Sequence, residues 1–231
     1  ARLLHTQKIF TYRDLPYTTQ LVPLAAMLTM LEDFADNDGV RAKLSQWYWC
    51  GVLGELYGSA IETRFAKDFP EMLDWVREGD TPTTIEDASF NPNRLYTLRT
   101  RNSAAYKGIH ALLLRGGAQD FRTGISIDDQ SYFDESIDIH HIFPKDWCAK
   151  QGIPAGRYNS IINKTPLSAK TNRMVGGNAP SSYLAKLQKN AAIDESRMDA
   201  ILRTHVIEPA YLRTDDVERM WQAREQALLT L

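Results

Sequence analysis

The chain has 231 residues, of which 43% are hydrophobic and 24% are charged, a composition typical of a globular protein with one or two domains. It excludes a disordered chain, a collagen-like chain and a disulfide-dense miniprotein. No apolar run approaches the ~20 residues of a membrane-spanning helix, and the first ten residues lack the apolar region of a secretory signal. Two cysteines without C-x-x-C spacing indicate free thiols, so we expect a cytoplasmic protein.

The net charge of −2 is unevenly distributed along the chain. Residues 141–190 contain eight Lys or Arg residues and a single acidic residue, Asp146, which gives this segment a net charge of +7. A basic segment within an otherwise acidic chain is typical of a surface that contacts a polyanion such as nucleic acid. A solvated lysine-rich face produces the same pattern, so charge alone leaves both interpretations open.

The first part of the chain is predicted to be helical. Apolar residues at three- and four-residue spacing predict helices over residues 19–36, 40–58 and 60–78, with Pro70 breaking the third. A loop is expected from 81 to 93. A further helix is predicted over 103–115, ending at Gly116-Gly117, and the aromatic residues between 47 and 57 are expected in the core.

The sequence pattern changes near residue 121. Short β-like runs occur at 124–127 and 136–143, and helical periodicity returns over 181–190, 194–204 and 215–230. We therefore predict an α+β, mainly α-helical protein in which a helical scaffold carries a small embedded β-containing motif. The expected parts are a helical region over 1–120, a core over 121–190 and C-terminal helices over 191–231 that pack on the core.

The run Asp138-Ile139-His140-His141-Ile142-Phe143-Pro144 places a carboxylate and two imidazoles inside an apolar strand. Burying these groups is costly unless they are hydrogen-bonded or bind a ligand. Neutral imidazole is both a ligand for divalent metals and a general base near neutral pH. Adjacent side chains of a regular strand face opposite ways, so His140 and His141 are expected to diverge. A structural histidine pair in a core without metal remains an alternative.

Two asparagines follow this strand along the chain. Asn163 lies 22 residues after His141, and Asn172 lies nine residues after Asn163. The segment between them predicts a short second strand around Thr165–Leu167 and then a helix that opens near Ser168. A strand with histidine, a strand that opens with asparagine and a helix that bears asparagine form the sequence layout of a ββα-metal site.

These motifs resemble the HNH endonuclease superfamily, also called His-Me finger nucleases. The segments D-I-H-H-I-F-P, N-K-T-P-L and T-N-R are similar in spacing to the HNH domain of CRISPR effector nucleases. Most of the chain, including L-P-Y-T-T-Q-L, W-Y-W, Y-G-S and N-A-P-S-S-Y-L, resembles the C-terminal half of GmrSD-type modification-dependent restriction proteins of bacteria. The resemblance implies a metal-dependent endonuclease that hydrolyses DNA phosphodiester bonds in an antiviral restriction system. It also implies an N-terminal ParB-like NTPase domain as a partner, whose D-G-Q-x-R motif does not occur in this sequence.

The resemblance also implies a role for each site residue. His141 corresponds to the general base, and Asn163 to the residue whose backbone orients that base. A divalent cation is implied, with His140 and Asn172 as its ligands. Asp138 is expected to lie next to these ligands without binding the metal itself. A shell with so few protein ligands suits Mg²⁺ or Mn²⁺. A site that contains a histidine ligand can also bind Zn²⁺ or Ni²⁺ in vitro. Phosphate contacts are expected from Lys164, Lys170 and Arg173, and a non-cleaving nucleic-acid-binding or regulatory module that retains the fold is the alternative function.

Overall fold

The computed structural model describes residues 2–59 and 61–231 and divides into two compact units. The first unit comprises Ala1–Asn91 and Thr100–Gly108, and the second comprises Pro92–Arg99 and Ile109–Leu231. The protein is mainly helical with one small two-stranded antiparallel sheet, which confirms the predicted fold class. Within the described residues, no helix has both the length and the apolar character needed to cross a bilayer.

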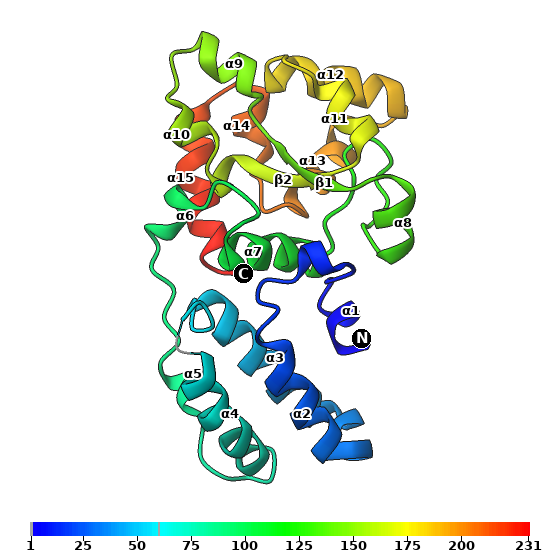
Figure 1. The fold of residues 1–231 in the computed structure, drawn as a ribbon. Coiled ribbons are helices and arrows are strands. Elements are labelled where there is room, and N and C mark those ends of the chain that lie inside the picture. The colour runs from blue at the N-terminus through cyan, green and yellow to red at the C-terminus, as the bar shows by residue number, and fades with distance from the viewer. Residues whose placement is uncertain (1, 60) are drawn as a thin grey trace. The chain divides into compact units, whose positions relative to one another are not determined.

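Helix α3 (Asp38–Leu53) of the first unit, labelled in Figure 1, carries several buried aromatic residues. This helix buries Trp47 and Tyr48, and Tyr57 is buried just beyond its end, which confirms that these aromatics belong to the core. The helices predicted over 19–36 and 40–58 are both present but end early. The elements are α1 (Arg2–Thr6), η1 (Tyr12–Asp14), α2 (Leu21–Leu31), η2 (Glu32–Asp36), α3 (Asp38–Leu53), α4 (Ile61–Trp75) and α5 (Thr83–Glu86), the last lying in the predicted loop.

The predicted break at Pro70 is wrong, because α4 continues through this residue to Trp75. A proline inside a helix removes one backbone hydrogen bond, but buried contacts hold α4 on both sides of it. Asp68 is fully buried and accepts hydrogen bonds from the hydroxyls of Tyr57 and Thr84. Met72 is buried on the other side. Tertiary packing therefore overrides the local preference.

The second unit contains the sheet and the remaining helices. α7 (Ala104–Arg115) begins in the first unit and ends in the second, where the predicted helix over 103–115 is confirmed. The strand expected over 124–127 is absent, and a single bridge between Gln119 and Ser126 occupies its place. The other elements are α6 (Arg94–Thr97), α8 (Asp129–Asp134), β1 (Asp138–His141), α9 (Lys145–Lys150), α10 (Ala155–Tyr158), η3 (Ile161–Asn163), β2 (Lys164–Leu167), α11 (Ala169–Val175), α12 (Pro180–Ala191), α13 (Glu195–Arg203), α14 (Pro209–Arg213) and α15 (Val217–Leu228).

Strands β1 and β2 pair antiparallel. Helix α11 follows β2 directly, which confirms the predicted strand around Thr165–Leu167 and the helix that opens near Ser168. The register places His140 opposite Thr165 and His141 opposite Lys164. Ser168 caps α11, because its hydroxyl accepts a hydrogen bond from the Thr171 N–H at 3.1 Å. Figure 1 shows the two strands side by side, with α12 next to α11.

Two buried polar side chains support β2 from behind. The Arg224 guanidinium on α15 donates to the carbonyls of Ile162 at 2.5 Å and Lys164 at 2.8 Å. His205 lies 2.7 Å from the Thr165 hydroxyl through Nδ1, and its Nε2 donates to the Gln119 carbonyl at 2.7 Å. Burial lowers the pKa of His205 to about 4, so the imidazole is neutral at pH 7. The two hydrogen bonds fit a neutral imidazole that is protonated at Nε2 and accepts from the Thr165 hydroxyl at Nδ1.

Candidate active site

The chain segment that leaves β1 is held by a buried clamp centred on Asn163. The Asn163 side chain accepts a hydrogen bond from Phe143 N–H at 2.8 Å and donates to the Phe143 carbonyl and the Tyr158 carbonyl, both at 2.9 Å. The Asn163 backbone carbonyl accepts from Ile142 N–H at 2.9 Å, and the Tyr183 hydroxyl donates to the Ile142 carbonyl at 2.9 Å. Every backbone polar group of the two residues after His141 therefore has a fixed partner.

The ring of His141 is oriented by Asn159. Its Nε2 lies 2.9 Å from the Asn159 side-chain oxygen, and its edge packs against Tyr158 with 6.1 Å between ring centroids. Because the amide oxygen is an acceptor, Nε2 carries the proton and Nδ1 keeps its lone pair. The sequence resemblance implies that the backbone of Asn163 orients this ring. In the structure Asn163 fixes the strand exit, whereas Asn159 fixes the ring.

The pKa of His141 is lowered from its ordinary value. Burial of the ring is the main cause, and the charges of Lys164 and Lys145 act in the same direction, while the hydrogen bond to Asn159 opposes them. The imidazole is consequently neutral at pH 7. A neutral imidazole with one nitrogen held and the other unprotonated is the form that can accept a proton as a general base.

His141 and Asn172 line the same pocket, as the ββα spacing predicts. The cavity has a volume of about 160 Å³, which is room for a cation with a few water molecules or phosphate oxygens, at ~30 Å³ for each water. β1, the start of α9 and the face of α11 each contribute to its wall. The lining residues are His141, Pro144, Lys145, Asp146, Asn172, Val175 and Gly176.

Helix α11 is anchored by a buried carboxylate at its first turn. Asp120 is 4% exposed, and it accepts hydrogen bonds from Ser168 N–H at 2.9 Å and the Thr171 hydroxyl at 2.7 Å. Burial alone would raise the pKa of Asp120, but these hydrogen bonds and one from Thr123 N–H lower it below its ordinary value. The ionised carboxylate thus fixes the helix that carries Asn172.

His140 lies on the other face of the sheet. Directly opposed residues of paired strands share a face, and consecutive residues alternate. The register therefore places His140 with Thr165, and His141 on the opposite side with Lys164, which is the divergence expected from the sequence. Asp138 shares the face of His140. Neither residue lines the pocket of His141 and Asn172, so the structure does not bring the two predicted ligands together.

Two residues of the pocket lining, Asn172 and Asp146, offer oxygen donors for a divalent cation. Among the described residues, no group of three or more His, Cys, Asp or Glu side chains is placed to hold a metal ion. The amide oxygen of Asn172 and the carboxylate of Asp146 are oxygen ligands of the type that Mg²⁺ and Mn²⁺ prefer. The sequence motifs did not single out Asp146, although it is the one acidic residue within the basic segment 141–190. They also missed Lys145 and Asn159, because nothing in the local pattern around Asn159 points to its contact with His141.

The three predicted phosphate contacts have different surroundings. Lys164 is 8% exposed, and its ammonium donates to the Arg99 carbonyl at 2.7 Å. Burial lowers the pKa of Lys164. Because its ammonium is directed into the protein, Lys164 is not placed to contact a phosphate in the way the sequence predicts. Lys170 and Arg173 are exposed on α11 on either side of Asn172, and their spacing of three residues places them on one side of the helix.

Comparisons with known proteins give one distant relative. The chain is 28% identical over 204 residues to an uncharacterized protein of Methanocaldococcus jannaschii, and the match covers 83% of this chain. It covers 33% of the relative, so the chain corresponds to about one third of that protein's length. No protein-family profile matches the chain, and no solved structure gives a significant match.

Replacing the central residue of the clamp tests its structural role. Asn163→Ala leaves the Phe143 N–H and the Phe143 and Tyr158 carbonyls without their buried partner. The Phe143 carbonyl keeps a weak bond from the Cys148 thiol, so two groups are left fully unpaired. At about 1–3 kcal/mol for each such group, we expect the free energy of unfolding in urea to fall by roughly 2–6 kcal/mol. Asn190→Ala, which removes one exposed hydrogen bond to the Lys186 carbonyl, is the control and should change stability by less than about 0.5 kcal/mol. Equal losses for both variants would contradict the clamp.

Proposed function

We propose that the second unit is a metal-dependent endonuclease that hydrolyses DNA phosphodiester bonds. The observation that carries this proposal is the pocket shared by His141, a neutral imidazole held through Nε2, and Asn172, an amide on the adjacent helix. A general base next to oxygen donors for a divalent cation is the minimum that such hydrolysis requires. The resemblance to HNH nucleases assigns chemistry of the same kind to these two positions.

His141 is the proposed general base. Its Nδ1 takes the proton of the water that attacks phosphorus, and Asn159 stabilises the resulting imidazolium by accepting the hydrogen bond from Nε2. The bond that breaks joins phosphorus to the leaving oxygen of the sugar. A bound Mg²⁺ or Mn²⁺ supplies Lewis-acid stabilisation of the phosphate and leaving oxygens. Asn172 and Asp146 are the residues that would hold it.

The ligand set in this proposal differs from the set implied by the resemblance. Asp146 takes the place of His140, because Asp146 lines the pocket and His140 lies across the sheet. An oxygen-rich site favours Mg²⁺ or Mn²⁺ over Zn²⁺ or Ni²⁺. His140 and Asp138 would be ligands only of a metal that lay on the opposite face of the sheet.

DNA is the proposed substrate because of the charge around the pocket. Within the basic segment 141–190, which carries a net charge of +7, Lys164 is directed inward and Arg157 is paired with Glu218. By contrast, Lys145 lines the pocket, and Lys170 and Arg173 are exposed on α11 on either side of Asn172. These side chains would bind phosphates without reading the base sequence. An antiviral restriction role and a partnership with an N-terminal ParB-like NTPase domain rest on the resemblance and are part of the proposal.

Removing the base should abolish cleavage without unfolding the protein. With supercoiled plasmid and Mn²⁺, we expect His141→Ala to nick about 10²–10⁴-fold more slowly than the parent, the range for loss of a general base. His5→Ala, a change at an exposed histidine far along the chain, is the matched control and should nick at the parental rate. EDTA should stop both active proteins. Parental nicking by His141→Ala would exclude this base, and binding without nicking by the parent would favour the non-cleaving module.

The acidic limb of the pH–rate profile should report the pKa of His141. Since this pKa is lowered, the neutral base persists, and activity is retained, to a lower pH than for an ordinary histidine. Lys145→Gln removes a charge that lowers this pKa, so the acidic limb should move to higher pH. Lys150→Gln, at the exposed end of the same helix, should leave it in place. The result that counts against the assignment is a shift of equal size in both variants, or none in either.

A further inference from the structure

A larger pocket in the first unit has a lining that the proposed nuclease does not use. Its volume is about 610 Å³, within the range of small-molecule binding sites. Three stretches that are distant in sequence build it: the residues around Tyr12 and Tyr17, those around Tyr57, and those around Arg101 and Lys107. The lining residues are Tyr12, Arg13, Leu15, Pro16, Tyr17, Thr18, Thr19, Tyr57, Gly58, Ile61, Arg101, Asn102 and Lys107.

Three tyrosines give the pocket aromatic surface at different depths. Tyr57 is 1% exposed and its hydroxyl is bonded to Asp68, so its ring is fixed. Tyr17 lies against it with 6.3 Å between ring centroids. Tyr12 is 75% exposed, yet it sits on η1, which the Asp14 carboxylate fixes by accepting a hydrogen bond from Thr11 N–H at 2.9 Å. An exposed ring on a fixed turn is a ready stacking surface for a planar base.

The charged lining of the pocket is entirely cationic. Arg13, Arg101 and Lys107 line it, and no acidic residue occurs among the described residues of its wall. The Lys107 ammonium donates to the Leu15 carbonyl at 2.8 Å, which fixes its position. Partial burial and the charge of Arg101 lower the pKa of Lys107, while the charge of Asp14, which does not line the pocket, opposes this shift. A partly buried cation attracts an anion more strongly than a fully solvated one.

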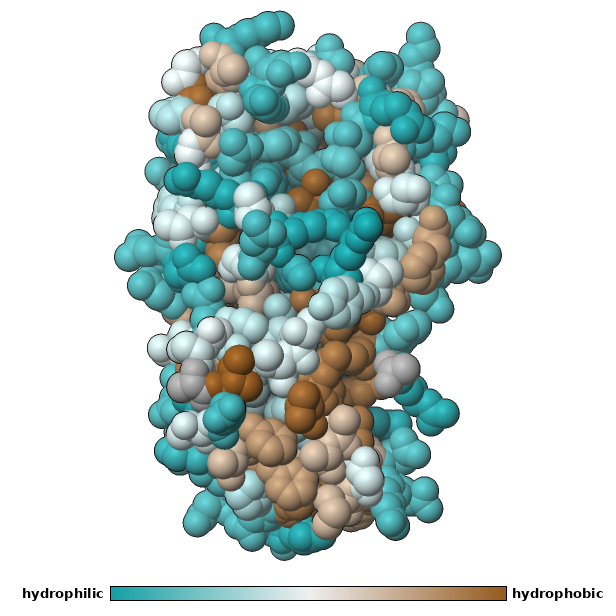
Figure 2. Space-filling view, viewed as in Figure 1, coloured by the Kyte–Doolittle hydropathy of each residue, from teal (hydrophilic) through white to brown (hydrophobic). Residues whose placement is uncertain are grey.

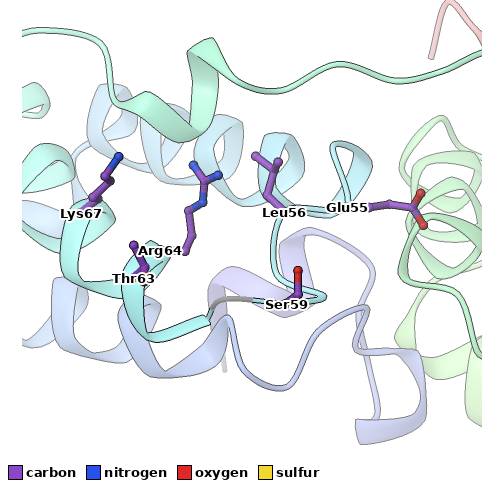
Figure 3. Close-up of a pocket in the computed structure, with 6 residues that line it drawn as sticks. All are labelled: Glu55, Leu56, Ser59, Thr63, Arg64 and Lys67. Atoms are coloured by element: carbon purple, nitrogen blue, oxygen red, sulfur yellow. The ribbon is translucent and has the colours of Figure 1, made fainter.

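The neighbouring pocket of the same unit is less suited to a ligand of this kind. Figure 3 shows Arg64 and Lys67 from α4 in its wall together with Glu55. Arg64 already binds the Asp87 carboxylate at 3.0 Å and the Thr84 hydroxyl at 3.2 Å. No aromatic ring lines this pocket among the described residues. The charge of Arg64 is thus already paired with Asp87, and the described lining of the pocket offers no aromatic surface on which a base could stack.

We propose that the tyrosine-lined pocket binds a nucleotide unit, an aromatic base that carries a phosphate. The base stacks on Tyr12 at the rim, and the phosphate lies against Arg13 with Arg101 and Lys107 behind it. Asn102 and the Thr18 hydroxyl line the pocket and can hydrogen-bond the base edge. The source is a mononucleotide or an unpaired position in a strand, because a base within a duplex is already stacked on both sides. The proposal does not depend on nuclease activity.

The exposed residues of the pocket allow a test in the folded protein. The probe is a short fluorescein-labelled oligothymidine, and its anisotropy is measured with full-length His141→Ala protein in EDTA so that no strand is cut. We expect Tyr12→Ala to weaken binding roughly 5- to 150-fold, as for loss of one base-stacking contact, and Arg13→Gln to weaken it as well. The matched controls Phe34→Ala and Arg77→Gln change exposed residues of the first unit outside the pocket and should bind as the parent does.

Competitors separate the two sources of the ligand. Displacement by thymidine monophosphate with a Tyr12-dependent affinity identifies a mononucleotide site, whereas displacement by oligothymidine alone identifies an unpaired strand position. An abasic strand, inorganic phosphate and a blunt duplex should all compete poorly. The proposal is overturned if Tyr12→Ala and Arg13→Gln bind like the two controls, or if the abasic strand competes as well as oligothymidine. Binding in EDTA without a catalytic base keeps this outcome separate from the nuclease test.

Discussion

The second unit depends on one buried amide, the side chain of Asn163. Its three hydrogen bonds to the Phe143 N–H and to the carbonyls of Phe143 and Tyr158 join the exit of β1 to the loop that precedes β2. In a dry interior each of these polar groups is costly to leave unpaired, so the three hydrogen bonds favour this arrangement of the loop and the strand end. Because Asn159 lies in the same loop, the clamp also determines where its amide oxygen meets the ring of His141.

The site is assembled from two independently anchored parts. One is the clamped strand end with His141, and the other is α11 with Asn172, which Asp120 holds through Ser168 and the Thr171 hydroxyl. Both anchors are buried and hydrogen-bonded, so the pocket between them is preformed. Burial and nearby lysine charge together lower the pKa of His141 and keep the imidazole neutral at pH 7, which is the state that proton abstraction requires.

Much of this arrangement is predictable from the sequence, because it depends on local patterns along the chain. The β-like runs at 136–143 and around Thr165–Leu167 predict the two strands, and Ser168 marks the start of the helix. The resemblance to HNH nucleases implies that His141 and Asn172 belong to one site, and period-two alternation predicts that His140 diverges. Contacts between distant residues left no such signal. The contact between Asn159 and His141 forms only in the folded protein, and the Lys164 ammonium is directed inward to the Arg99 carbonyl. Helix α4 continues through Pro70 because Asp68 and Met72, on either side of it, are buried.

The most direct test of the account is the position of a bound metal relative to the two faces of the sheet. A crystal soaked with Mn²⁺ and measured at the manganese absorption edge locates the ion by its anomalous scattering. The account predicts an ion in the pocket at the oxygens of Asn172 and Asp146, with His141 Nε2 still bonded to Asn159. The account would be contradicted by an ion bound on the sheet face of His140 and Asp138 together with no ion in the pocket of His141.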